Sequence, residues 1–183
     1  GALLAAYARG DGQWRRAEAA AEEMEARGVH HNVITYTALI TAYGGQWERA
    51  EKVMATMLEG GVRPDVTAYS ALINSYACAP FGGQWERAER AVAEMRRAGL
   101  EPNVVAWNAL LNAYARGGGR WAEAERAVEE MLGQGLRPDG ITYNSLLAAY
   151  ANGGGQWERA EAAVERMRAE GIRPTSITYN SLV

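Results

Sequence analysis

The residues of this sequence that could do chemistry are short polar side chains at fixed places in a repeated motif. The decapeptide RPDGITYNSL at 137–146 returns as RPTSITYNSL at 173–182, with Thr175 in the place of Asp139. An ionised aspartate only accepts hydrogen bonds, an asparagine both donates and accepts, and a threonine hydroxyl does both from a shorter side chain. The exchange therefore changes which hydrogen-bonding partner that place can select.

Catalysis and metal binding have little support in the sequence. His30 and His31 are adjacent, so they cannot share one helical face, and no carboxylate cluster accompanies them. Cys78 is the only cysteine, which excludes an intramolecular disulfide and a cysteine-based metal site. The glycine-rich stretches GGGRW and GGGQW lack the Lys-Ser/Thr of a phosphate-binding loop. We therefore expect no enzymatic activity, no metal and no cofactor.

Composition and charge indicate an ordered chain with no overall attraction to nucleic acid. Of the 183 residues, 48% are hydrophobic, which supports a packed core. The net charge of −3 gives no global pull on RNA or DNA, so any such binding must come from local chemistry. Two uncharged stretches, 28–47 and 66–85, are interrupted by Gly, Asn, Thr and Tyr, and we expect no membrane-spanning helix. No signal peptide is evident.

An internal repeat organises the chain and must position these polar residues. Three columns of residues share the intervals 33, 38, 36 and 36: Trp14, Trp47, Trp85, Trp121 and Trp157; Met24, Met57, Met95, Met131 and Met167; and Tyr36, Tyr69, Trp107, Tyr143 and Tyr179. The variation in length falls in one glycine-rich connector, where insertions are tolerated best. Periods in this range are typical of stacked helical repeats.

Each unit predicts two helices. The segment at 121–135 has apolar residues at i, i+3, i+7 and i+10 with charges on the other face, and Pro138 prevents its continuation. The segment at 141–151 is apolar and almost uncharged, which indicates a helix that is buried or that faces something other than bulk water. We expect the Trp and Tyr columns to pack in the core; a base-stacking Trp platform is the alternative. The ERAE runs at 48–51, 86–89 and 158–161 predict solvated faces with local ion pairs.

Stacked helical pairs of this kind predict an all-α fold, an α-solenoid, because one pair cannot bury both of its faces alone. The expected units are 33–65, 66–103, 104–139 and 140–175, with a partial unit at 1–32 and the start of a further unit at 176–183.

The sequence resembles the pentatricopeptide repeat family over its whole length. The first helices open with VITYTALITAY, VTAYSALINSY, VVAWNALLNAY and GITYNSLLAAY, and the units close with MLEGGVRPD, MRRAGLEPN, MLGQGLRPD and MRAEGIRPT. The resemblance implies a right-handed superhelix of tandem helix-turn-helix repeats. It also implies binding of single-stranded RNA, with one base read by each repeat.

The resemblance implies two base-reading positions per unit, namely the residue after the first-helix aromatic and the last residue of the unit. The resulting pairs are Thr37 with Asp65, Ser70 with Asn103, Asn108 with Asp139, and Asn144 with Thr175; Asn32 and Asn180 belong to incomplete pairs. The family code implies G, A, U and a pyrimidine, 5′ to 3′. An ionised Asp only accepts hydrogen bonds, so it suits the N–H edge of U or G. The alternative interpretation of these Asn and Asp residues is that they cap helices or form turns.

Two further sets of residues complete the implied interface. The second residue of each unit would flank the base: Ile34, Thr67, Val105 and Ile141. Arginines after the first helix or before the closing proline are candidates for phosphate contact: Arg9, Arg116, Arg63, Arg137 and Arg173.

Two functions follow as expectations. The first is sequence-selective binding of single-stranded RNA in organellar RNA processing, stabilisation or translation, in a chloroplast or mitochondrion by family resemblance, with neither a membrane nor a small-molecule partner. The alternative is a structural subunit or scaffold of a large organellar complex, such as a ribosome, held by protein contacts. The acidic balance favours the second reading.

Overall fold

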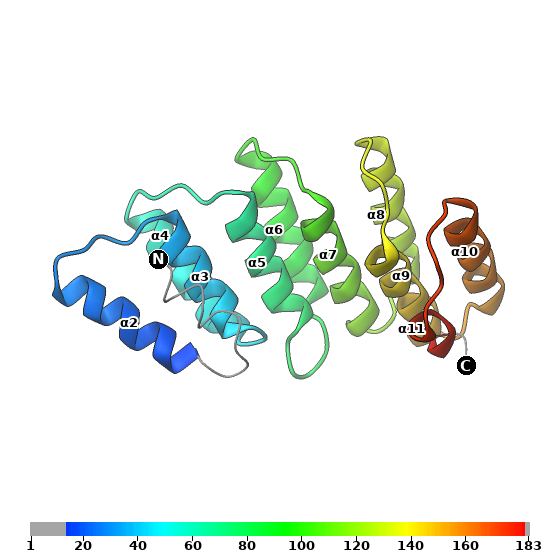
Figure 1. Ribbon diagram of the computed structural model, residues 1–183, viewed down its shortest axis with the longest axis horizontal. Coiled ribbons are helices and arrows are strands. Elements are labelled where there is room, and N and C mark those ends of the chain that lie inside the picture. The colour runs from blue at the N-terminus through cyan, green and yellow to red at the C-terminus, as the bar shows by residue number, and fades with distance from the viewer. Residues whose placement is uncertain (1–13, 182–183) are drawn as a thin grey trace.

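The computed structural model describes residues 14–181, and these residues form ten α-helices and no strand. The helices are α2 (Trp14–Ala26), α3 (Val33–Tyr43), α4 (Trp47–Glu59), α5 (Val66–Ala77), α6 (Trp85–Arg97), α7 (Val104–Arg116), α8 (Trp121–Gly133), α9 (Gly140–Asn152), α10 (Trp157–Ala169) and α11 (Ser176–Asn180). They follow one another along an elongated stack (Figure 1). The predicted all-α solenoid is confirmed.

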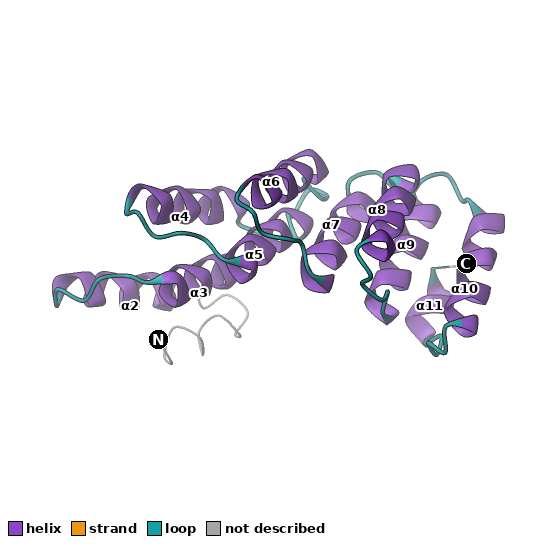
Figure 2. Cartoon of the chain, turned by 90° about the horizontal axis from the view of Figure 1, so that it is seen from above, coloured by secondary structure: helices purple, strands orange, loops and turns teal. Residues whose placement is uncertain are grey.

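The stack has two layers. The first helices α3, α5, α7 and α9 pack against one another in succession, and the second helices α4, α6 and α8 each pack against the first helices on either side. Figure 2 shows α4 and α6 lying over α3 and α5. Successive first helices therefore form a continuous layer, and this brings the start of each first helix close to its counterpart in the next unit.

The first helices begin at side-chain caps. The side chains of Asn32, Asp65, Asn103 and Asp139 each accept a hydrogen bond from the backbone N–H three residues further on, at 2.8–3.0 Å. Such a cap stabilises a helix by about 1 kcal/mol. The capping alternative is therefore realised at four candidate base-reading positions. One capping bond leaves further acceptor capacity on each side chain, so capping does not exclude a second role.

The second helices end at a left-handed glycine that turns the chain back toward the core. After α8, Gly135 has φ +74° and the N–H of Leu136 donates to the carbonyl of Met131 at 3.1 Å. A glycine adopts this conformation without the penalty that a Cβ would add. The turn lets Leu136 pack against the core before Pro138 and the next first helix.

The predicted core columns are largely confirmed. Tyr36, Tyr69, Trp107 and Tyr143 are buried, as are Met57, Met95, Met131 and Met167. Tyr179 is the exception at 47% exposed, because among the described residues no helix follows α11 to cover it.

The prediction for the Trp column is right only in part. Trp47, Trp85 and Trp121 are half-buried against the core, and Trp157 is 65% exposed. Guanidinium groups cover the outer ring faces: Arg49 on Trp14, Arg87 on Trp47, Arg120 on Trp85 and Arg159 on Trp121, at 4.2–4.5 Å from the ring centroids. The rings therefore act as cation–π contacts between units.

The expectation of local ion pairs in the ERAE runs is wrong. Arg49 and Glu51 bond to other units instead: Arg49 donates to Glu18 at 2.7 Å, and Glu51 accepts from Arg87 at 2.7 Å and from the Tyr76 hydroxyl at 2.8 Å. Tyr43 with Glu18 and Arg49, and Tyr150 with Glu125 and Arg159, repeat this arrangement. Since the partners lie 25 to 36 residues apart, a search for i,i+4 pairs cannot find them.

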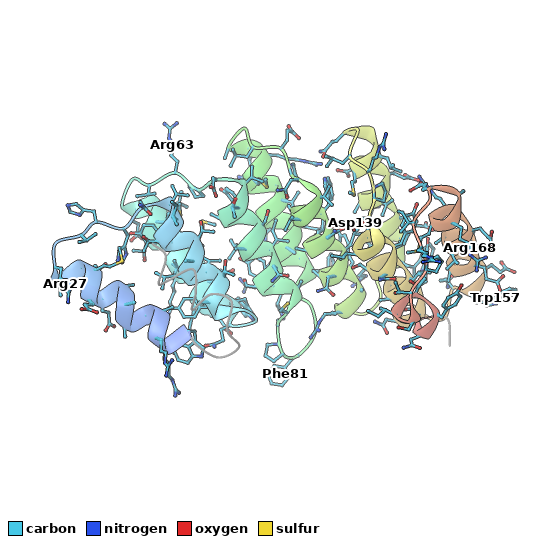
Figure 3. All side chains as sticks on the ribbon, viewed as in Figure 1. Arg27, Arg63, Phe81, Asp139, Trp157 and Arg168 are labelled. Atoms are coloured by element: carbon cyan, nitrogen blue, oxygen red, sulfur yellow. The ribbon has the colours of Figure 1, made fainter. Side chains whose placement is uncertain are left out.

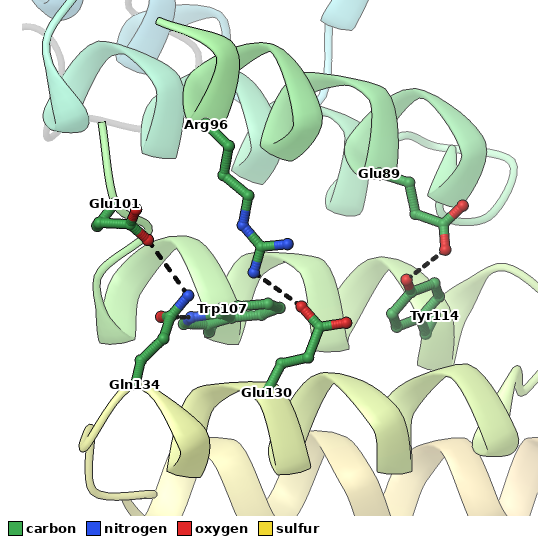
Figure 4. Close-up of polar contacts among 7 residues, drawn as sticks. All are labelled: Glu89, Arg96, Glu101, Trp107, Tyr114, Glu130 and Gln134. Atoms are coloured by element: carbon green, nitrogen blue, oxygen red, sulfur yellow. Dashed lines mark hydrogen bonds and ion pairs between the residues drawn. The ribbon is translucent and has the colours of Figure 1, made fainter. Parts of the chain in front are cut away.

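One junction departs from this pattern. Tyr114 donates to Glu89 at 2.5 Å, but α8 carries Glu123 where the other units carry the arginine. Figure 4 shows this contact and the bonds beside it, from Arg96 to Glu130 at 2.7 Å, from Trp107 to Gln134 at 3.0 Å and from Gln134 to Glu101 at 3.4 Å.

The glycine-rich connectors are closely packed. They are not only loops that tolerate changes in length. A Cβ on Gly83 would lie 2.3 Å from the carbonyl oxygen of Ala113, and one on Gly119 would lie 2.1 Å from the backbone nitrogen of Gly153. Gly83 therefore packs against the backbone at the end of α7, and Gly119 packs against the backbone of the next connector; only glycine allows these approaches.

Candidate nucleic-acid interface

The two predicted reading positions lie on either side of each boundary between units, and at two boundaries their side chains meet. The residue after the first-helix aromatic lies one turn into its helix, and the last residue of the unit caps the next first helix. Because first helices pack in succession, the pair spans the boundary. Asn108 donates through Nδ2 to Asp139 at 3.1 Å to Oδ1 and 3.3 Å to Oδ2, and Ser70 Oγ lies 3.5 Å from Asn103 Oδ1.

The other two pairs are arranged differently. Within residues 14–181, no hydrogen bond joins Thr37 to Asp65 or Asn144 to Thr175. Asn144 instead accepts through Oδ1 from the Thr178 hydroxyl at 2.8 Å, and the backbone N–H of Thr175 donates to that same hydroxyl at 3.0 Å. The incomplete pairs are represented by Asn32, which caps α3, and by Asn180, which is exposed on α11.

The two rows differ in burial. Ser70 and Asn108 are 4% and 9% exposed, and Thr37 and Asn144 are half-buried. Asp65, Asn103 and Thr175 are exposed, and Asp139 is half-buried. Each boundary thus combines a recessed polar side chain with a more accessible one, as a shallow recognition site requires.

Asp139 is held as an anion. Burial acts to raise the pKa of its carboxyl, but hydrogen bonds from the backbone N–H of Thr142 and from the amide of Asn108 outweigh burial, so the pKa lies below its ordinary value. The carboxylate at this boundary is therefore acceptor-only near neutral pH.

A row of apolar side chains projects from the same part of the first helices. Ile34, Val105 and Ile141 are 61–63% exposed and Thr67, at the equivalent place, is exposed too. Ile177 is 62% exposed on α11 and extends the row by one unit. The sequence reading omitted Ile177, although the same column of second residues would have found it. Regularly spaced, exposed branched residues are suited to contact with the flat face of a base.

The arginines predicted to contact phosphates lie at or just before the ends of the first helices. Arg63, Arg137 and Arg173 are exposed in the loops that precede α5, α9 and α11, and Figure 3 shows Arg63 projecting into solvent. Arg116 is exposed on the last turn of α7, and its guanidinium donates to the carbonyl of Ala79 at 3.5 Å. Arg9 lies outside the described residues.

The grooves between second helices form a separate surface. One of them, of about 440 Å³, lies between α6 and α8 and has Trp107, Leu110 and Tyr114 from α7 among its lining residues. Val105 is two residues from Trp107, so helical geometry places them on opposite faces of α7. Glu89, Glu123 and Glu130 line this groove together with arginines, and such mixed charge does not favour an anionic strand.

The described residues offer no metal or membrane site. Within residues 14–181 no group of three or more His, Cys, Asp or Glu side chains is arranged to hold a metal ion. None of the helices in the same range is both long and apolar enough to cross a bilayer. Cys78 is exposed, and His31 lies 3.1 Å through Nε2 from the carbonyl oxygen of Ala21.

Solved structures of similar proteins agree with this fold. The chain is similar to the pentatricopeptide repeat protein PPR10 in complex with an 18-nucleotide psaJ RNA element, with 27% identity, a TM-score of 0.77, and coverage of 90% of this chain and 24% of that one. PPR10 from maize gives 32% identity and a TM-score of 0.69, covering 98% of this chain and 25% of that one. The chain thus spans about a quarter of the length of PPR10.

A more distant structure supports the fold alone. The pentatricopeptide repeat domain of Arabidopsis thaliana protein-only RNase P 1, in complex with tRNA, is 16% identical with a TM-score of 0.73; the match covers 92% of this chain and 88% of that one. No curated protein matches the sequence.

Family models settle the classification. The pentatricopeptide repeat domain model matches residues 20–79, 81–117 and 126–183, and the PPR repeat model matches residues 105–136. The chain belongs to the pentatricopeptide repeat family.

Proposed function

We propose that this chain binds single-stranded RNA and that each boundary between units reads one base. The observation that carries the proposal is the contact between Asn108 and Asp139, with exposed Val105 and Ile141 at successive unit starts. The similar PPR10 structure is a complex with an 18-nucleotide RNA, which supports the same ligand class here.

Base selection would follow from the hydrogen-bonding types of each pair. Asp139 is acceptor-only and so suits the N–H of U or G, and the long side chain of Asn108 favours the smaller of the two bases. Thr37 with Asp65 leaves room for G, and Ser70 with Asn103 suits A. Asn144 with Thr175 leaves a less defined pyrimidine. The branched residues at the second position of successive units would pack on either side of each base.

Affinity would be modest. A stacked base contributes roughly 1–3 kcal/mol, and association itself has a substantial free-energy cost. Few arginines lie near the interface, so binding would depend only weakly on salt concentration. Because the chain spans about a quarter of PPR10, four boundaries would act as one part of a longer recognition surface.

The cellular role would be that of a non-catalytic RNA-binding segment. We propose that it acts in a chloroplast or mitochondrion, a location that family membership supports, where a bound strand would be shielded from nucleases or held open for other machinery. Ribonucleoprotein or ribosome components are the partners expected if protein contacts dominate instead.

The test is a change of base preference by one reading residue. Wild-type protein is titrated against four short RNAs with a GAU core that differ only at the U, and Asn108→Thr is titrated in parallel. Preference should move from U towards G by about tenfold, since the hydrogen bonds involved are worth about 1 kcal/mol each.

The matched control is Asn112→Thr, which alters a half-buried asparagine one turn further along α7 and should leave the preference unchanged. Equal affinities of the wild-type protein for all four RNAs, together with ribonuclease-resistant capture in a large complex, would instead support the scaffold function.

A further inference from the structure

A third residue contacts the reading pair at two of the boundaries. The hydroxyl of Thr142, the third residue of α9, lies 2.7 Å from Oδ1 of Asn108 and 3.0 Å from Oδ1 of Asp139, and it accepts the backbone N–H of Asp139 at 3.0 Å. Thr178, the third residue of α11, repeats the contact with Asn144 at 2.8 Å. Both threonines are fully buried at 0% exposed.

The identity of this third residue changes together with the reading residue that precedes it. The asparagines at 108 and 144 are followed in the next unit by Thr142 and Thr178. The hydroxyl residues Thr37 and Ser70 are followed by Ala68 and Ala106, and Ser70 turns its hydroxyl to the carbonyl of Val66 at 2.7 Å in its own helix. A reading residue that is asparagine is thus followed by threonine at the third position of the next first helix. A reading residue that is threonine or serine is followed by alanine at that position.

The contact fixes which end of the asparagine amide faces which neighbour. A hydroxyl has one proton, and Oγ1 of Thr142 lies closer to Oδ1 of Asn108, at 2.7 Å, than to Oδ1 of Asp139, at 3.0 Å, which indicates that Thr142 donates the proton to Asn108. Oδ1 of Asn108 is then held by Thr142 while Nδ2 donates to Asp139. The reverse orientation would place the amide oxygen beside a carboxylate, and two acceptors would repel each other.

The two asparagine boundaries are not equally constrained. At Asn108 both Thr142 and the carboxylate of Asp139 hold the amide, whereas at Asn144 the partner is the Thr178 hydroxyl and the closing residue Thr175 carries no charge. The neutral hydroxyl of Thr175 can donate or accept, so it selects neither end of the amide. Thr178 accepts the backbone N–H of Thr175 at 3.0 Å and donates to Oδ1 of Asn144, so the Asn144 amide depends on Thr178 for its orientation.

We infer that the third residue of each first helix is a specificity-determining positioning residue for the preceding unit: threonine orients an asparagine reader, and alanine accompanies a threonine or serine reader. The inference rests on the proposed function and extends it from two polar residues per base to three, the third of which does not touch the base.

The test removes the Thr142 hydroxyl without changing the shape of the side chain. Thr142→Val and Thr142→Ser are titrated against the four RNAs that differ at the base facing 104–139, and against a second set that differs at the base facing 66–103. Loss of the bond from Asp139 N–H weakens the α9 cap and lowers affinity for every RNA alike, so the ratio of dissociation constants within each set is the readout.

Thr142→Val should reduce discrimination at the base facing 104–139 by about fivefold, as expected for one net hydrogen bond. The ratio of dissociation constants at the base facing 66–103 should stay unchanged. Thr142→Ser should keep the wild-type ratio at both. Unchanged discrimination in Thr142→Val would overturn the inference and leave the proposed function standing. A wild-type protein that discriminates at neither base would overturn both.

A gain of discrimination provides the second arm and covers the case in which Thr142→Val does not fold. Ser70→Asn creates an Asn–Asn pair opposite Ala106, and Ser70→Asn with Ala106→Thr supplies the missing hydroxyl. The double variant should prefer a pyrimidine at least about threefold more strongly than Ser70→Asn alone. Equal ratios in the two variants would overturn the inference.

Discussion

The junction around Tyr114 should become more stable when Glu123 is replaced by arginine. At the other three junctions an arginine two residues after the Trp donates to the tyrosine-bound glutamate at 2.7 Å: Arg49 to Glu18, Arg87 to Glu51 and Arg159 to Glu125. At this junction Glu123 faces the Tyr114 site instead, and Glu89 has the hydroxyl of Tyr114 but no arginine partner at that place. Arg126, three residues further along α8, is the cation that acts on the Tyr114 hydroxyl here, and Glu123→Arg would add the arginine that the other three junctions have.

The magnitude follows from what the change adds and removes. The glutamates that accept such an arginine have side chains 29–35% exposed, and a partly exposed ion pair contributes up to about 1 kcal/mol. Removing the repulsion between Glu89 and Glu123 adds to this, whereas losing an acid from the first turn of α8 costs about 0.3–1 kcal/mol. No cation–π gain is counted, because Arg120 already covers Trp85. The net gain should be about 0.5–1 kcal/mol.

Thermal and urea unfolding followed by far-UV circular dichroism measure this gain. The midpoint temperature should rise by about 2–4 °C for a chain of this size per kcal/mol gained. Glu129→Arg, an exposed site on the same helix, gives the same change in net charge and is the control. A midpoint that does not rise in Glu123→Arg, or that rises equally in Glu129→Arg, would show that the tyrosine–glutamate–arginine contact does not stabilise the junctions.

Two further predictions concern stability. Gly83→Ala should destabilise the fold by about 1–3 kcal/mol, since its Cβ would lie 2.3 Å from a backbone oxygen of the next unit. Gly133→Ala, in open space at the end of α8, should be neutral or stabilising by up to about 1 kcal/mol in the same urea titration. Alkaline pH should also weaken the fold. Burial, assisted by the bound glutamates, raises the pKa of Tyr43, Tyr76, Tyr114 and Tyr150 above the ordinary value. The unfolded chain therefore loses these protons first, and the stability present below about pH 10 declines as pH rises further. A urea midpoint that stays constant from about pH 9 to pH 11.5 would contradict this assignment.

The sequence predicted the parts of the fold that depend on local periodicity. The spacing of Trp121, Val128 and Met131 located α8, and the apolar stretch at 141–151 located α9 to within one residue at each end. The polar residues that close the units were found by resemblance, and their capping role was recognised as an alternative because Asn and Asp favour that position.

The sequence reading missed contacts between units. Arg87 bonds to Glu51, 36 residues away, and Thr142 bonds to Asn108, 34 residues away. Such pairs become neighbours only when the units stack, so no helical periodicity within one unit reveals them. Thr142 in particular could be seen in the sequence only as one member of a column in which each residue is either threonine or alanine.

Intermolecular nuclear Overhauser effects between the methyl groups of this protein and a short GAU-containing RNA would test most directly where a base lies. If each boundary reads one base, the methyl groups of Val105 and Ile141 should show contacts to the H5 and H6 protons of the uracil, and those contacts should disappear when the U is replaced by an abasic site. Contacts from Val92 or Val128, which line the grooves between second helices, with none from Val105 and Ile141, would contradict the account.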